Sequence, residues 1–287
     1  MRKLIEGVID DIGEMSSLDG VCSKTAGWVT RATKGDFVKN ALSGTWLGHP
    51  LHPVLSDLPV GAWAMASALD VTAGRGGAKA ARRLVGLGLL SAVPTAAAGW
   101  SDWADTYGPP QRVGYAHALG NAAGVALQAA SWVARARGRR GAGVMLSGVG
   151  LGVTVCAAYL GGHLSFVRGI GVNHTAFQEP ATKWTDVASL SVLSEDKLVR
   201  VTVEGVPVVL VRHDGQVYAL SATCTHAGGP LDEGKIVGDG CIECPWHGSV
   251  FRLADGEAVR GPASVDEPPW DVKIDSGRVL VRPATSS

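Results

Sequence analysis

The chain has 287 residues and no net formal charge; 46% of the residues are hydrophobic and only 18% are charged. This length accommodates two domains, and the balanced charge excludes the basic surface that nucleic-acid binding requires. Residues 54–162 are rich in Ala, Gly, Leu and Val, whereas the chain from residue 183 has strand-like patterning and ordinary charge density. The sequence therefore predicts a two-domain α+β protein, with a helical half followed by an antiparallel all-β half.

Four apolar stretches in the first half each have about the length that crosses a bilayer, which takes roughly 20 residues. They are Val54–Ala73, Leu84–Trp103, Tyr115–Ala134 and Ala142–Gly162. Gly120 with Gly124 and Gly148 with Gly152 have the spacing of close helix contacts in lipid. The alternative, a soluble Ala/Gly-rich bundle, would need charged outer faces that these segments lack. We therefore predict a four-helix transmembrane bundle.

The predicted domain organisation has four parts. Residues 1–46 form an N-terminal segment that is partly helical, because its apolar residues recur at helical spacing. Residues 47–174 form the four-span membrane domain, residues 175–182 a linker, and residues 183–287 the β domain.

Basic residues concentrate in the first and third connections between the predicted spans. They are Arg75, Lys79, Arg82 and Arg83 in the first, and Arg135, Arg137, Arg139 and Arg140 in the third. Cytoplasmic loops carry such an excess of Lys and Arg. We therefore expect a multi-pass protein of the cell membrane whose termini, and with them the β domain, lie on the extracytoplasmic side.

Four histidines lie near span ends that this topology brings to one face: His49, His52, His117 and His163. An ionisable residue at membrane depth is by default a functional residue. Histidines on facing helices ligate a haem b iron, hold a divalent metal or hydrogen-bond a quinone. The alternative is that the His-Pro pairs only cap and orient the chain at the membrane surface.

The membrane half resembles the DUF2231 family of small four-helix membrane proteins. The resemblance rests on the string Leu47-Gly48-His49-Pro50-Leu51-His52-Pro53, on the Asp57 and the Leu58-Pro59-Val60-Gly61 that follow, and on Gly161-Gly162-His163. It covers residues 44–174 and implies no activity.

Two segments of the second half carry residue types that bind iron. Cys224 and His226 form a Cys-x-His motif, and Cys244 and His247 form a Cys-x-x-His motif 17 residues further along the chain. Two thiolates on one iron and two imidazoles on the other are the ligands of a Rieske-type [2Fe–2S] cluster. Zinc also binds two cysteines and two histidines, but zinc fingers place their cysteines as one close pair and their histidines as another.

The residues of both motifs resemble those of the Rieske family, and the segment Cys-Pro-Trp-His-Gly-Ser resembles the ferredoxins of ring-hydroxylating dioxygenase systems. Gly229 and Trp246 stand where cytochrome bc-type members have two cysteines that form a disulfide. The resemblance implies that Ser249 hydrogen-bonds a bridging sulfide, and that Phe251 replaces the tyrosine of high-potential members. We therefore expect a reduction potential in the lower half of the family's range of roughly −150 to +300 mV.

Short β-branched runs surround these motifs and predict strands. They are Val199–Val203, Val206–Arg212, Gln216–Leu220, Cys241–Glu243, Ser249–Leu253, Trp270–Ile274 and Arg278–Val281. Seven to ten such strands predict a compact sandwich or barrel.

We interpret the chain as a membrane-bound carrier of single electrons, and as an electron-transfer component rather than a complete enzyme. Its cluster would exchange electrons with an unknown redox partner protein, or with a haem or quinone in its own membrane domain. If the helices bind no cofactor, they are an anchor. A redox sensor and an electron-donating component of an oxygenase or reductase system are the alternatives. A complete Rieske oxygenase needs a mononuclear iron domain after the cluster, for which no residues remain before Ser287.

Overall fold

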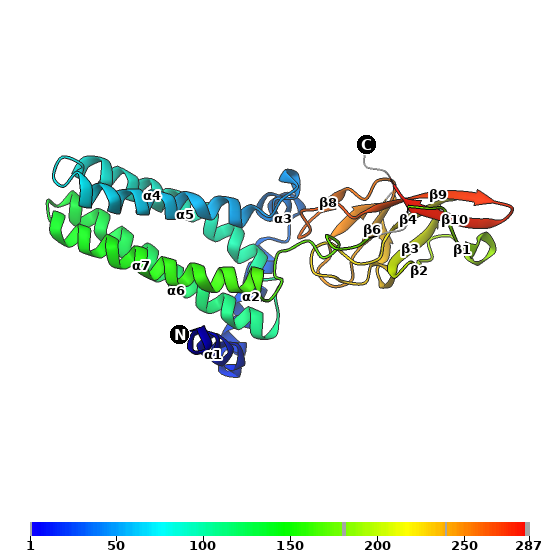
Figure 1. Cartoon of the computed structure of the whole chain (residues 1–287), viewed down its shortest axis with the longest axis horizontal. Helices are drawn as coiled ribbons and strands as arrows, with labels where there is room; N and C mark the ends of the chain where they lie inside the picture. The colour runs from blue at the N-terminus through cyan, green and yellow to red at the C-terminus, as the bar shows by residue number, and fades with distance from the viewer. Residues whose placement is uncertain (1, 180–181, 239, 285–287) are drawn as a thin grey trace. The chain divides into compact units, whose positions relative to one another are not determined.

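The structure is a computed structural model that describes residues 2–179, 182–238 and 240–284. The chain divides into two compact units (Figure 1). The helical unit comprises Met1–Gly35 and Leu51–Ile170, and the strand unit comprises Asp36–Pro50 and Gly171–Ser287. This division differs from the domain boundaries expected from the sequence, because residues 36–50 belong to the strand unit although they precede the first long helix.

Four long helices form the body of the helical unit (Figure 1). They are α4 (Leu51–Thr72), α5 (Ala78–Trp103), α6 (Gly108–Ala136) and α7 (Arg140–Phe166). The connections are short, so that α4 pairs with α5, and α6 with α7, as two helical hairpins. Three of the helices, α4, α5 and α7, are long and apolar enough to cross a membrane. The predicted set of four spans thus corresponds to four long helices, of which α6 is the most polar.

Two further helices, α1 (Arg2–Glu14) and α2 (Asp19–Ala32), pack against α6. Arg112 at the start of α6 links them, because its guanidinium donates to the Gly13 carbonyl at 2.6 Å and to the Asp19 carboxylate at 2.7 Å. The N-terminal segment is therefore helical, as its periodicity predicts, and its third helix, α3 (Asp36–Ser43), belongs to the strand unit.

Glycines let α6 and α7 approach each other closely. A Cβ atom on Gly120 would lie 2.9 Å from the Cβ of Ala157, so the predicted role of Gly120 in close packing is confirmed. For Gly148 and Gly152 the same prediction is wrong, because a Cβ on either would meet nothing within 4 Å among the described residues. On α7 it is Gly150 that faces the partner helix, with the Gly124 carbonyl 3.3 Å from the position of its missing Cβ.

The strand unit holds two antiparallel sheets. The first has the order β1-β10-β9-β4-β3-β2, built from β1 (Thr185–Ser189), β2 (Val199–Val203), β3 (Val206–His213), β4 (Gln216–Ser221), β9 (Pro269–Asp275) and β10 (Arg278–Pro283). The second has the order β5-β6-β7-β8, built from β5 (Lys235–Val237), β6 (Cys241–Glu243), β7 (Val250–Arg252) and β8 (Ala258–Arg260). All seven predicted strands are present. The sequence analysis missed β1, β5 and β8.

The predicted ligand cysteines are part of a hydrophobic core. Cys224 and Cys244 are buried in one cluster with Leu220, Ile242 and Phe251, which come from β4, β6 and β7. Both loops that carry the predicted ligands are therefore anchored in packed side chains from both sheets.

A buried ion pair joins α4 to α6 at the end of the helical unit where α4 terminates. Both side chains are almost fully buried, with exposed fractions of 3% for Arg135 and 1% for Asp70, and the guanidinium contacts both carboxylate oxygens. Removing one member of such a pair leaves an uncompensated buried charge, which is more costly than the pair itself.

We therefore predict that Asp70→Asn destabilises the full-length protein by about 3 kcal/mol or more, because the Arg135 charge stays buried without its partner. The measurement is denaturant unfolding of the detergent-solubilised protein followed by helical circular dichroism. Asp57→Asn is the matched control on the same helix, since Asp57 is exposed. Equal midpoints for both variants would contradict the assignment.

Candidate metal centre

Two loops with the same backbone hydrogen bonds carry the predicted ligands. In the first, the Cys224 amide donates to the Gly229 carbonyl and the Gly228 amide donates to the Cys224 carbonyl, both at 2.8 Å. The second loop, Cys244–Ser249, repeats both bonds at 2.8 and 3.1 Å. Gly228 and Gly248 take the equivalent position with φ of +76° and +71°, a conformation that glycine adopts without steric cost. Glycine at these positions is therefore a requirement of the turn.

The two cysteines meet at the base of these loops. Both are free thiols in the structure, and a hydrogen bond joins their side chains. The Cys244 sulfur accepts that bond and further bonds from the amides of Trp246 and His247, which together lower its pKa to about 7. The same pairing and burial raise the pKa of Cys224. Backbone amides aimed at a sulfur stabilise the thiolate that binds a metal.

The two predicted histidine ligands lie together as well. The ring centroids of His226 and His247 are 4.9 Å apart and their planes are nearly perpendicular, at 86°. Burial, helped by the nearby His247, Lys39 and His174, lowers the pKa of His226 to about 3. The Nδ1 atom of His226 is buried and has no hydrogen-bond partner among the described residues. A neutral imidazole with a free nitrogen is what a metal ligand requires, so these residues fit an iron–sulfur group.

A tryptophan closes the space between the two loops. A Cβ on Gly229 would lie 2.9 Å from the Cys244 sulfur and 3.1 Å from the Trp246 ring. Trp246 therefore packs directly over the backbone of the opposite loop at Gly229. These are the two positions at which cytochrome bc-type Rieske proteins have the cysteines of a disulfide. The loops are held by this contact without a covalent link.

A third loop, after β8, supports the second ligand loop. Ser249 Oγ is buried and accepts the amide of Ala263 at 3.0 Å. A hydroxyl group that accepts one bond still has its proton to donate; that Ser249 donates it to cluster sulfur stays a prediction. Arg260 donates to the Gly248 carbonyl at 2.6 Å. Phe251 is fully buried and offers no donor.

The α3 segment, residues 36–50, is bound to this third loop. The Asn40 amide donates to the Val259 carbonyl at 3.0 Å and its oxygen accepts the Gly261 amide at 2.9 Å. Thr45 donates to the Ala263 carbonyl at 3.0 Å, and Asp36 accepts from Arg260 at 2.7 Å. The sequence analysis missed this contact, because its partners are more than 200 residues apart.

A second segment, residues 171–178, binds the first ligand loop. The His174 amide donates to the Thr225 carbonyl at 3.1 Å, and Ser221 donates to the Gln178 side chain at 3.0 Å. The His174 ring lies 3.4 Å from the position that a Cβ on Gly228 would take. Both segments that lead to and from the long helices therefore contact the loops of the candidate centre.

A buried carboxyl group, Glu267, lies behind the first ligand loop. Its Oε2 accepts the Thr225 amide at 3.0 Å, and its Oε1 has no partner among the described residues. Burial raises the pKa of Glu267 well above the ordinary range, against the opposing effect of the Thr225 bond. Burial of this carboxyl group therefore favours its protonated, neutral form. The sequence around Glu267, which precedes Pro268-Pro269, did not indicate that this side chain is buried beside the ligand loop.

The four predicted membrane histidines have different environments. His52 on α4 and His117 on α6 face each other, with ring centroids 6.3 Å apart. His163 accepts a hydrogen bond from Arg168 at 3.4 Å at the end of α7, and His49 is exposed and belongs to the strand unit. The structure thus brings together two of the four.

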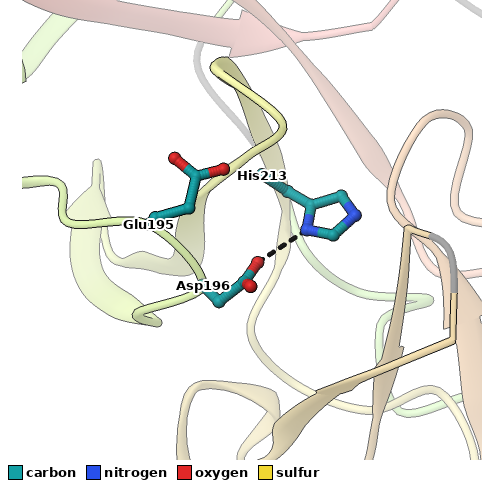
Figure 2. Close-up of side chains that lie close together, drawn as sticks. All are labelled: Glu195, Asp196 and His213. Carbon is teal, nitrogen blue, oxygen red and sulfur yellow. Dashed lines mark hydrogen bonds and ion pairs between the residues drawn. The ribbon is translucent and has the colours of Figure 1, made fainter.

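Figure 2 shows another group of metal-binding side chain types, Glu195, Asp196 and His213, whose ligand atoms lie within 4.8 Å of one another. His213 Nδ1 donates to Asp196 at 2.6 Å, and this bond raises the pKa of His213. Glu195 accepts the Gly215 amide at 3.2 Å and pairs with Arg212 at 3.6 Å. The side chains satisfy one another, so we interpret the group as a surface ion-pair network.

Two adjacent β loops that carry two paired thiols and two paired imidazoles define an iron–sulfur electron-transfer protein. Comparison with known proteins gives the same result. Residues 183–273 match the family described as Rieske [2Fe-2S] domain, and residues 48–174 match a predicted membrane protein family, DUF2231. The chain belongs to the Rieske family and joins its Rieske [2Fe–2S] domain to a DUF2231 membrane domain.

The relatives of the Rieske domain include small ferredoxins. The ferredoxin component of the naphthalene 1,2-dioxygenase system of Pseudomonas putida is 33% identical over 99 residues, which are 34% of this chain and 94% of that protein. Ferredoxin CarAc of Metapseudomonas resinovorans is 34% identical over 99 residues, which are 34% of this chain and 92% of that protein. The ferredoxin of carbazole 1,9a-dioxygenase from Nocardioides aromaticivorans IC177 has a solved structure with 32% identity and a TM-score of 0.34, covering 36% of this chain and 99% of that one.

We predict that Phe251→Tyr raises the reduction potential of the cluster, because a buried hydroxyl would donate to a cysteine sulfur and offset negative charge in the reduced state. Potentiometric titration followed by EPR measures both proteins. We expect the unsubstituted protein below about +200 mV, within the family's lower range. Phe251→Leu is the matched control, since it adds no donor. A value above that limit, or equal shifts in both variants, would show that position 251 does not set the potential.

Proposed function

We propose that this protein is a membrane-bound carrier of single electrons whose cluster is held by Cys224 and Cys244 on one iron and by His226 and His247 on the other. The observation that carries the proposal is the buried, unpartnered Nδ1 of His226 beside a second imidazole, in a loop whose His226 backbone amide bonds the Cys224 thiol that is paired with Cys244. A Rieske cluster takes up and releases one electron at its histidine-ligated iron.

The surroundings of the two imidazoles favour one of them as the side where a redox partner docks. Lys39 and His174, from the segments that bind the loops, lie near His226. His247 adjoins Trp246, whose ring is 6.4 Å away by centroid and whose side chain is 56% exposed. An exposed aromatic side chain next to a half-buried ligand is typical of a docking surface. The partner would therefore contact His247 and Trp246.

The sequence likeness to the ferredoxin components of the naphthalene and carbazole dioxygenase systems supports a redox protein as that partner. Electron donation to an oxygenase or reductase is one form of the proposed function. The membrane domain adds a second redox site at His52 and His117, where a haem or a quinone would exchange the electron.

Ligand substitutions in the full-length protein test the proposed cluster. Cys224→Ser, Cys244→Ser, His226→Ala and His247→Ala should each abolish the Rieske EPR signal of the dithionite-reduced protein, because each removes a bond to iron. Cys241→Ser is the matched control, a third cysteine in the same region, and should keep the signal. A signal that survives any of the four substitutions would overturn the ligand assignment.

We further propose that the Rieske domain lies on the extracytoplasmic side, because the α4–α5 and α6–α7 connections carry the basic residues. Fusion of alkaline phosphatase to the C-terminus should give an active enzyme in intact cells, since this reporter is active only outside the cytoplasm. A fluorescent protein fused at the same point should stay dark if it is exported by the general secretion route. Bright fluorescence together with inactive phosphatase would reverse the orientation.

A further inference from the structure

The helical unit contains an internal structural repeat. Each residue of α4 corresponds to a residue of α6 that lies 65 positions later in the chain; His52, for example, corresponds to His117. Each residue of α5 corresponds to a residue of α7 that lies 62 positions later; Gly99, for example, corresponds to Gly161. The hairpin of α4 and α5 is thus matched by the hairpin of α6 and α7, although few residues are identical.

Equivalent side chains make equivalent bonds in the two hairpins. His52 Nδ1 bonds the Thr95 carbonyl at 2.9 Å, and its counterpart His117 bonds the Ala157 carbonyl at 2.7 Å. Further along α4, the Trp63 indole donates to the Val85 carbonyl at 3.4 Å. The matching residue of α6 is Gln128, whose side-chain amide donates to the Ser147 carbonyl at 3.1 Å. Both acceptor pairs are related by the same shift of 62 positions.

Each histidine lies against a matching glycine. A Cβ on Gly99 would lie 2.7 Å from the His52 ring, and a Cβ on Gly161 would lie 2.8 Å from the His117 ring. Any larger residue would displace the imidazole. The two hairpins therefore create the same pocket for the same side chain.

Two pairs of equivalent residues also meet each other. His52 faces His117, with centroids 6.3 Å apart and ring planes at 86°, and Asp70 pairs with Arg135. In an arrangement with two-fold symmetry, a residue contacts its own counterpart only where it lies next to the symmetry axis. The histidine pair therefore lies at the interface of the repeats, which is where membrane proteins with internal repeats bind ions and substrates.

The hydrogen bonds determine which nitrogen of each ring is free. A neutral imidazole has one N–H, and in both rings Nδ1 lies against a backbone carbonyl, which can only accept. Each Nε2 therefore carries a lone pair. The Asn121 amide donates to the His117 carbonyl at 3.0 Å and lies 3.2 Å from the Nε2 of His117, so a metal ion bound at that nitrogen takes the place of this second contact. A quinone carbonyl is also an acceptor, so this pair has no N–H left for it. A lone pair on each ring suits a metal ion.

We propose that His52 and His117 are the two axial ligands of a haem iron in the membrane domain. The group of metal-binding side chains found in the described part of the chain is Glu195, Asp196 and His213, so no third protein ligand joins the histidine pair. An ion bound by two imidazoles needs its remaining ligands from elsewhere, and a porphyrin supplies four. Two imidazoles bound to opposite sides of one metal at about 2.0 Å have centroids roughly 6 Å apart, as this pair has. This inference extends the proposed function by naming the second one-electron centre.

The test uses the full-length protein, purified in detergent and titrated with haemin. We expect one haem per chain, with a Soret band and the low-spin EPR signal of a bis-histidine iron. His52→Ala and His117→Ala should each weaken haemin binding by at least about tenfold, since each removes an axial ligand. His49→Ala and His163→Ala are matched controls and should bind like the unsubstituted protein.

A second variant tests the pocket without removing a ligand. Gly161→Val should weaken haemin binding because its side chain displaces the His117 ring, whereas Gly148→Val should not, since a Cβ there meets no described residue within 4 Å. In all variants the Rieske EPR signal reports a folded strand unit, and helical circular dichroism reports a folded bundle. An unsubstituted protein that binds no haemin, or variants that bind it equally well, would overturn the haem site while leaving the cluster assignment intact.

Discussion

The candidate centre depends on the close approach of two β loops that no covalent bond joins. The loops meet because Gly229 leaves room for the Cys244 sulfur and for the Trp246 ring, both of which a side chain at position 229 would displace. Each loop is closed by the same two backbone hydrogen bonds, and each cysteine is packed in the core beneath. Pre-organisation of this kind holds four ligand side chains in place before the group they bind is present.

Two segments that hydrogen-bond these loops lie outside residues 183–287, the β domain predicted from the sequence. The α3 segment binds the third loop through Asn40 and Thr45, and that loop in turn donates the Ala263 amide to Ser249. Residues 171–178 bind the first ligand loop through His174. Lys39 and His174 thereby help to keep His226 neutral, since a positive neighbour disfavours a second positive charge. The ferredoxin relatives align with about a third of this chain.

Local patterns predicted the parts of the structure that local physics determines. The motifs Cys-x-His and Cys-x-x-His placed all four candidate ligands, and alternation of β-branched residues placed seven strands. The strands β5 and β8 were missed; they have three residues each, too few to show alternation, and unlike the equally short β6 and β7 they do not adjoin the Cys244–His247 motif. The bonds of Asn40 to residues 259 and 261 connect positions with no local relation. Histidine count alone could not separate His52 and His117 from His49, because the distinction depends on which backbone carbonyls and glycines lie opposite.

The repeat explains why one of its central pairs is identical and the other is not. Residues beside a two-fold axis face their own counterparts, so a charged residue there would face the same charge, which is costly in a buried site. The pair at one end consists of Asp70 and Arg135, whose unlike charges attract, with exposed fractions of 1% and 3%. The pair at the other end consists of two histidines, which can meet as neutral rings because each gives its only N–H to a backbone carbonyl. Identity at this position is therefore compatible with burial only while both imidazoles stay neutral, and that is the state in which both can bind one metal ion.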